Sequence, residues 1–179
     1  MTNKVLFIAN ISGHATPQTL QHLAHVTHEH GGSWITSKIN YLDDQIAGLI
    51  KIQCPESSLE MIQTAFDEAS GLQAHFVQSQ ENKHAEDDVY ELRFDSQEQA
   101  GIIKELTHIL ERERANILSI DTQRLFLAGE NGISANLFTS QFSITIPEET
   151  NIKDVIAELE AITQGTRVID VTSMLSKEE

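Results

Sequence analysis

Hydrophobic and polar positions along the chain follow one pattern that occurs twice. The first half opens on an apolar run over 5–8, and a helical stretch over 17–30 follows, with its apolar side chains at helical spacing. Two strand-like runs over 34–42 and 46–54 come next, joined by a short acidic turn. A second amphipathic stretch and a last strand-like run over 73–77 complete this half.

The second half repeats this order of elements. Tyr90, Leu92 and Phe94 alternate with charged residues, which predicts a half-buried strand. A clearly amphipathic helix over 102–110 and a long strand over 117–127 follow. The remaining predicted elements are a strand through 142–146, a helix that opens at Pro147, and a strand over 168–171.

The order strand-helix-strand-strand-helix-strand is the ferredoxin-like βαββαβ arrangement. The sequence therefore predicts an α+β chain of two such domains in tandem, over 1–80 and 89–179, each an antiparallel sheet with its helices on one face. The acidic stretch over 81–88 is predicted to be a linker. The other face of each sheet can pair with a further domain or subunit, which leaves a homodimer open. The run over 5–8 is apolar at successive positions, which favours burial on both sides of that strand.

The second half carries short motifs that resemble those of ACT domains. That family has an acidic, glycine-containing turn after its first strand and Asn-Ile at the opening of its second strand. Here Glu98-Gln99-Ala100-Gly101-Ile102 occupies the turn, with Ala100 in place of the family's proline, and Asn116-Ile117 follows. The first half departs further, because His14-Ala15-Thr16-Pro17 fills the turn and Trp34 stands where asparagine is expected.

Two ACT-like domains that nearly fill a chain of this size resemble the glycine cleavage system transcriptional repressor family. The resemblance implies a cytoplasmic regulator, not an enzyme, that has no DNA-binding element of its own. It also implies a LysR-type transcription activator as the partner protein and glycine as the signal. A regulatory subunit that binds an amino-acid biosynthetic enzyme is the alternative.

The turn over 98–102 is the better candidate for binding an amino acid. A helix N-terminus presents unpaired N–H groups that suit a carboxylate, Gly101 leaves room for it, and Glu98 suits the ammonium group. Asn116 and Ile117 are expected beside this turn, where the asparagine offers both a donor and an acceptor. A purely structural role also stays open, with Gly101 allowing tight packing and Asn116 capping a turn.

The corresponding first-half site is predicted to be weaker. It comprises His14, Ala15, Thr16, Pro17 and Trp34. Pro17 removes one N–H donor and Trp34 replaces the asparagine with a bulky side chain.

Charge and cysteine content limit the functions and the cellular compartment that the sequence predicts. The net charge is −15, and the 12 lysines and arginines are scattered, which argues against direct binding of nucleic acid. The single cysteine, Cys54, agrees with a reducing compartment, and no apolar run is long enough to span a bilayer. His22, His25, His28 and His30 are spaced by three, three and two, which predicts a solvated helix face and no metal site. No nucleophilic or cofactor-binding motif stands out, so the sequence predicts neither catalysis nor a cofactor.

Overall fold

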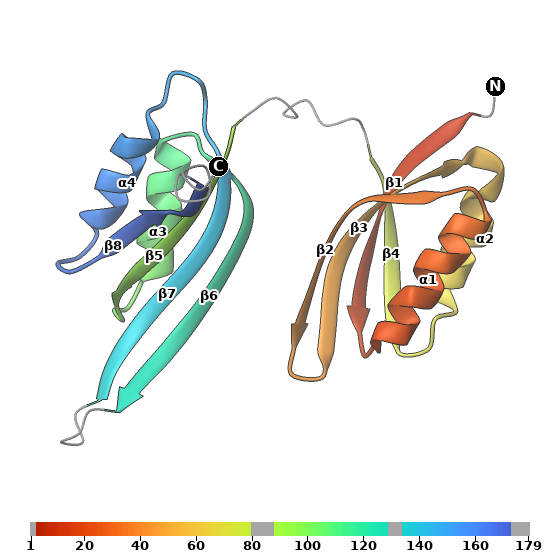
Figure 1. The fold of residues 1–179 in the computed structure, drawn as a ribbon, viewed down its shortest axis with the longest axis horizontal. Coiled ribbons are helices and arrows are strands. Elements are labelled where there is room, and N and C mark those ends of the chain that lie inside the picture. The colour runs from red at the N-terminus through yellow and green to blue at the C-terminus, as the bar shows by residue number, and fades with distance from the viewer. Residues whose placement is uncertain (1–2, 80–87, 129–133, 173–179) are drawn as a thin grey trace, which may run out of the picture. The chain divides into compact units, whose positions relative to one another are not determined.

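The computed structural model describes residues 3–79, 88–128 and 134–172, and the chain divides into two compact units, 1–82 and 83–179 (Figure 1). Most of the predicted linker, 81–87, lies outside the described residues. Among the residues described, no helix is long and apolar enough to cross a membrane.

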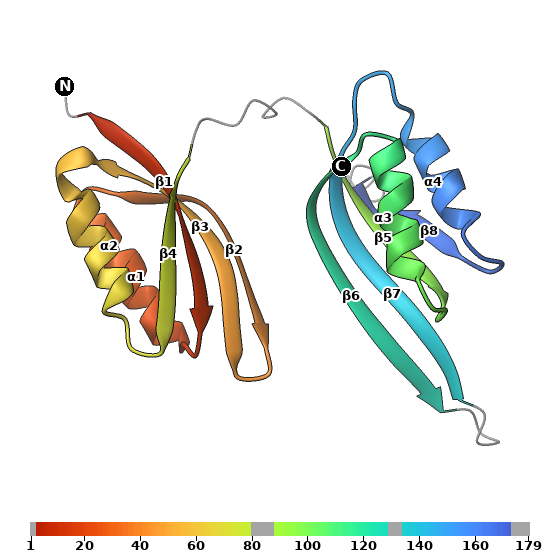
Figure 2. The same cartoon turned by 180° about the vertical axis from the view of Figure 1, so that it is seen from behind.

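The first unit is one four-stranded antiparallel sheet with two α-helices on one of its faces (Figures 1 and 2). The strand order is β2-β3-β1-β4. Its elements are β1 (Lys4–Gly13), α1 (Pro17–Glu29), β2 (Ser33–Leu42), β3 (Gln45–Pro55), the 3₁₀ turn η1 (Glu56–Ser58), α2 (Leu59–Asp67) and β4 (Leu72–Gln78).

Alternation along the strands builds the core of this unit. On β1 the side chains of Phe7, Ala9 and Ile11 are buried beneath the helices, whereas the intervening residues face the other side of the sheet. The helices contribute Leu23 from α1 and Phe66 from α2. The full buried apolar set is Phe7, Ala9, Ile11, Leu23, Ile46, Ile50, Ile52, Cys54, Ile62, Phe66 and Leu72.

A β-bulge interrupts the alternation in β2. Strict alternation would place Ile35 inward together with Ile39, but the register shifts between Trp34 and Thr36. As a result Ile35 is 51% exposed, and Trp34 points inward onto Phe66, with ring centroids 6.4 Å apart.

The second unit has the same topology, with strand order β6-β7-β5-β8. Its elements are β5 (Val89–Gln97), α3 (Ile102–Arg112), β6 (Asn116–Ala128), β7 (Ser134–Thr145), α4 (Ile152–Glu160) and β8 (Arg167–Asp170). The buried apolar set is Leu92, Phe94, Ile102, Leu106, Leu110, Phe138, Phe142, Ile144, Ile146, Val155 and Leu159. The predicted fold class, two βαββαβ units in tandem, is confirmed.

The lone cysteine supplies a test of the first core. Cys54 is 1% exposed, and burial raises the pKa of its thiol, because the thiolate would lose its hydration. We expect a thiol reagent at pH 8 to modify the native chain roughly 100-fold more slowly than the urea-unfolded chain, since reaction requires local opening. Equal rates in the two states would contradict the burial of Cys54.

Candidate ligand site at the start of helix α3

The turn between β5 and α3 is open on its outer side. Gly101 begins the helix with a φ of +86°, a conformation that side-chain-bearing residues rarely adopt. A Cβ atom placed on Gly101 would meet nothing within 4 Å. The next residue, Ile102, is buried in the core and anchors the first turn of the helix.

A surface depression of about 560 Å³ lies at this turn. It is lined by Glu98, Gln99, Ala100, Gly101, Ile102, Ile103, Arg124 and Asn136. The structure therefore brings the five predicted residues of the turn together. It adds one basic and one amide side chain from the β6–β7 hairpin.

Opposite charges meet in this depression. Nε of the Arg124 guanidinium lies 2.8 Å from Oε1 of Glu98 as an ion pair, and the two side chains are 63% and 24% exposed. The backbone N–H of Glu98 donates to the carbonyl oxygen of Asn136 at 3.0 Å, which ties the turn to the hairpin. The pair involves Nε and one carboxylate oxygen, so it does not use the second oxygen of Glu98 or the two outer nitrogens of Arg124, and both residues line the depression.

The first turn of α3 adds backbone donors. The N–H of Glu105 makes the first helical bond, to the carbonyl of Gly101 at 3.1 Å, so the N–H groups of Ile103 and Lys104 precede the helical ladder. Gly101 provides no side-chain cap, whereas Thr16 caps α1 and Asn151 caps α4. The start of α3 thus keeps partial positive charge beside the Glu98–Arg124 pair.

Comparisons with known proteins place the fold. No family model and no curated protein sequence matches the chain. Among solved structures, an unknown protein from Galdieria sulphuraria has a TM-score of 0.77 at 17% identity, covering 93% of this chain and 97% of its own. A structure described as a "putative glycine cleavage system transcriptional repressor" has a TM-score of 0.66 at 14% identity, covering 93% of this chain and 98% of its own. At such identities the likeness is one of fold.

The fold is a tandem of two ACT-like domains. The β5–α3 turn is the first strand–helix turn of the second ACT-like domain. The corresponding turn of the first ACT-like domain joins β1 to α1.

Asn116 and Ile117 do not lie beside the turn of the second ACT-like domain, and the expectation that they would is wrong. The register aligns Asn116 with Thr145 and, through it, with Val89 at the start of β5. The turn follows Gln97 at the other end of that strand, about 26 Å away along the sheet at 3.3 Å per residue. Because α3 returns the chain to the starting end of β5, the beginning of β6 lies far from the turn.

The residue that takes the expected place of Asn116 is Arg124. Sequence reasoning missed it because an exposed arginine in a strand carries no motif. The antiparallel topology does contain the signal. Because Asn116 is level with the start of β5, the residue of β6 near the far end of β5 is the ninth from Asn116, which is Arg124. Its charge is opposite to that of Glu98.

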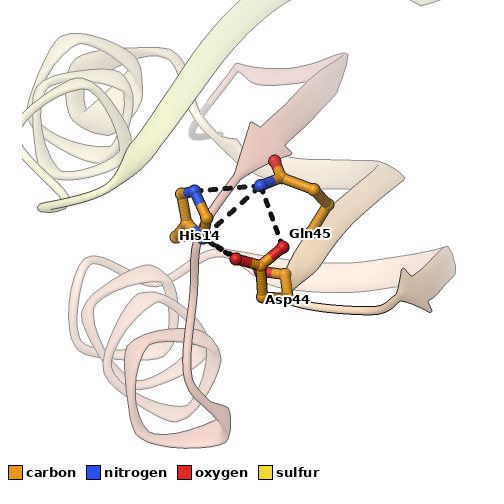
Figure 3. A network of polar contacts seen from close by, with 3 residues as sticks. All are labelled: His14, Asp44 and Gln45. Carbon is orange, nitrogen blue, oxygen red and sulfur yellow. Dashed lines mark hydrogen bonds and ion pairs between the residues drawn. The ribbon is translucent and has the colours of Figure 1, made fainter.

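In the first ACT-like domain, polar contacts join His14 of the turn to Asp44 and Gln45 of the β2–β3 hairpin (Figure 3). Nδ1 of His14 lies 3.0 Å from the carbonyl oxygen of Asp44 and 3.6 Å from its carboxylate. The amide nitrogen of Gln45 lies 2.9 Å from Nε2 of the same ring. The β2–β3 hairpin therefore already uses both ring nitrogens of His14.

The other first-domain residues have structural contacts. Thr16 accepts the N–H of Thr19 at 3.3 Å as the cap of α1, and Pro17 is the first helical residue. Ala15 packs against the core. Trp34 lies at the other end of α1, where its Nε1 donates to the hydroxyl of Thr27 at 3.2 Å. Trp34 is therefore not part of the turn.

The helix α1 histidines face solvent for the most part. His25 lies 3.3 Å from Glu29 one turn along, and His22 and His28 are exposed. Within the described ranges, no group of three or more histidine, cysteine or acidic side chains is arranged to hold a metal ion.

Proposed function

We propose that this chain is a cytoplasmic, non-catalytic regulatory protein that acts by binding a LysR-type transcription activator and is tuned by a small amino acid, glycine. The observation that carries the proposal is the Glu98–Arg124 pair beside the uncapped start of α3 in an ACT-like domain. The fold shared with a structure described as a glycine cleavage system repressor supports the regulatory part.

The charges of the depression suit a free amino acid. A zwitterion presents a carboxylate and an ammonium group a few ångströms apart. The guanidinium of Arg124 and the N–H groups of Ile103 and Lys104 suit the carboxylate. The free oxygen of Glu98 suits the ammonium group. Gly101 adds no side chain to the space between these groups, and a surface depression of this kind favours a ligand with a small side chain.

A non-catalytic role agrees with the placement of the one thiol. Cys54 lies in the core of the first domain, and burial raises the pKa of its thiol. Both features disfavour the thiolate form that a nucleophilic cysteine needs. The Glu98–Arg124 pair offers binding groups but no activated nucleophile with an adjacent base.

Titration calorimetry of the full chain tests the ligand. We expect glycine to give a saturable heat, and serine and the branched-chain amino acids to bind progressively less well as their side chains grow. Potassium chloride at matched ionic strength serves as the control for general salt effects. Saturation by a branched-chain amino acid but not by glycine would contradict the proposed ligand.

The charge of the chain predicts its behaviour toward DNA. With a net charge of −15, the isolated chain is expected not to bind duplex DNA at physiological salt, because few cations are available to displace counterions. Fluorescence anisotropy with a labelled random duplex measures this. A sub-micromolar affinity that falls steeply with added salt would overturn the prediction.

A further inference from the structure

The face of the first sheet that the helices leave open carries an unusual set of side chains. The first unit has three lysines and no arginine, and all three, Lys4, Lys38 and Lys51, lie on this face. They share it with apolar side chains from three strands. We define the lysine face as Lys4, Leu6, Ile8, Lys38, Leu49, Lys51 and Val77.

Strand register fixes these neighbours. Ile8 stands in the middle of the sheet, directly opposite Lys51 on one side and Val77 on the other. Leu49 stands opposite Lys38. Phe7 and Ala9, on either side of Ile8 in the chain, are buried under the helices, so Ile8 must point to the open side.

The apolar part of the lysine face is accessible. Leu49 is 51% exposed and Val77 is 45% exposed, and Leu6 and Ile8 beside them are half-buried. Such side chains on adjacent strands form one patch, and a contiguous patch on a small domain commonly marks an interaction site.

The open face of the second sheet is different in kind. Its polar side chains bind one another: the hydroxyl of Ser119 donates to Ser143 at 3.0 Å, and Ser143 donates to the carboxylate of Glu91. Two rows further along the same face, Thr139 donates to the carboxylate of Asp95 at 2.6 Å. That face pairs its central polar groups internally, and its exposed apolar side chains Val89 and Leu125 lie at opposite ends of the sheet, so they do not form one patch.

Most acidic residues of the first unit lie away from the lysine face, and Glu56, whose carboxylate accepts from the side chain of Asn3, lies at its edge next to Lys4. The described ones are in α1, in the β2–β3 turn, and in or next to η1 and α2: Glu29, Asp43, Asp44, Glu56, Glu60, Asp67 and Glu68. Carboxylates therefore gather on the helical side and the turn, and cations gather on the open side. In the described part of the first unit, the open face is thus basic and apolar, although the chain as a whole is strongly acidic.

We propose that the lysine face is the docking surface for a protein partner that presents apolar side chains flanked by carboxylates, such as an acidic amphipathic helix. Apolar side chains of the partner would cover Ile8, Leu49 and Val77, and its carboxylates would meet Lys4 and Lys51. This inference rests on the proposed function, because it names the surface through which the regulator holds its partner.

Two other occupants fit less well. A second copy that used the same face would bring two sets of three lysines together, and like charges across an interface are unfavourable. Single-stranded RNA is bound on sheets by aromatic side chains that stack on bases, and the lysine face has no Phe, Tyr or Trp. A protein surface that is both acidic and apolar complements the charge and the apolar side chains of the lysine face.

The probe for the test is a labelled synthetic helix with leucines on one face and glutamates on the other, titrated against the full chain by fluorescence anisotropy. A second peptide has the same leucines with glutamine in place of glutamate. The variants are the triple change Lys4→Gln, Lys38→Gln, Lys51→Gln and the single change Leu49→Ser. The matched control removes the same charge from the second domain by Arg114→Gln, Lys153→Gln and Arg167→Gln.

We expect the glutamate peptide to bind the unaltered chain, and the glutamine peptide to bind it at least about tenfold more weakly. Both the lysine triple and Leu49→Ser should weaken binding of the glutamate peptide by about tenfold or more, while the control triple leaves it unchanged. Unchanged melting curves for the variants exclude loss of folding as the cause.

Three results would overturn the proposal: no binding of the glutamate peptide, equal loss in the lysine triple and the control triple, or self-association that Leu49→Ser abolishes. The last would make a second copy the occupant. Capture of a transcription activator by the lysine triple as efficiently as by the unaltered chain would refute the docking surface and leave the proposed function intact.

Discussion

Gly13→Ala is expected to unfold the first domain. Gly13 ends β1 with a φ of +131°, and a Cβ atom there would sit 2.2 Å from the carbonyl oxygen of Gly71. That carbonyl also accepts the N–H of His14 at 2.8 Å, so the two backbones cannot separate without losing a hydrogen bond and the adjoining β1–β4 pairing. Backbone strain and this overlap together should cost about 3 kcal/mol or more of unfolding free energy.

Trp34 makes the effect measurable for this domain by itself. It is the only tryptophan, and it packs in the first core, so its fluorescence during urea unfolding reports the first domain. Gly31→Ala is the matched control, since Gly31 also has a positive φ, +73°, but its Cβ would lie 3.5 Å from the nearest atom. We expect the control to cost only about 1 kcal/mol. Equal midpoint shifts in the two variants would show that the close approach to Gly71 is absent.

Gly101→Val is expected to weaken glycine binding by at least about tenfold. The valine side chain would project into the depression between the start of α3 and Arg124, where the carboxylate of the ligand is proposed to lie. The change also strains the backbone, because a β-branched residue at a φ of +86° costs about 1–2 kcal/mol.

Gly165→Val separates these two effects. Gly165 has the same φ, +86°, its Cβ would likewise meet nothing within 4 Å, and it does not line the depression. Both variants should lose similar stability, but only Gly101→Val should lose affinity. Arg124→Gln, which removes a charged donor with little change in size, should also lower affinity by about tenfold or more. Calorimetry with glycine distinguishes the outcomes, and equal affinities in all four proteins would place any binding site elsewhere.

Much of the fold follows from local patterns in the sequence. Alternation along the strand with Leu92 and Phe94, and helical spacing from Ile102 to Leu110, fix each element and its buried side. The order of these elements is then compatible with only a few sheet topologies. What local patterns cannot supply is a bulge, because the extra residue at Ile35 changes which side chains face inward without a distinct sequence signal.

The candidate site was predictable only in part. Glu98 and Gly101 are three positions apart in the sequence, and they do share one depression with Ile102. Arg124 depends on how far β6 runs past the start of β5, which is a property of register and not of any motif. The same register separates Asn116 from the turn.

Affinity capture with the full chain as bait, from a lysate of its own cells, directly tests whether the protein binds a transcription activator in a glycine-dependent way. The bait is the unaltered chain or Gly101→Val, each with and without added glycine, and bound proteins are identified by mass spectrometry. We expect a LysR-type transcription activator to be recovered, and we expect glycine to change the amount recovered with the unaltered chain but not with Gly101→Val. Recovery of an amino-acid biosynthetic enzyme in place of a transcription activator would refute the proposed transcriptional role and favour a regulatory subunit of that enzyme.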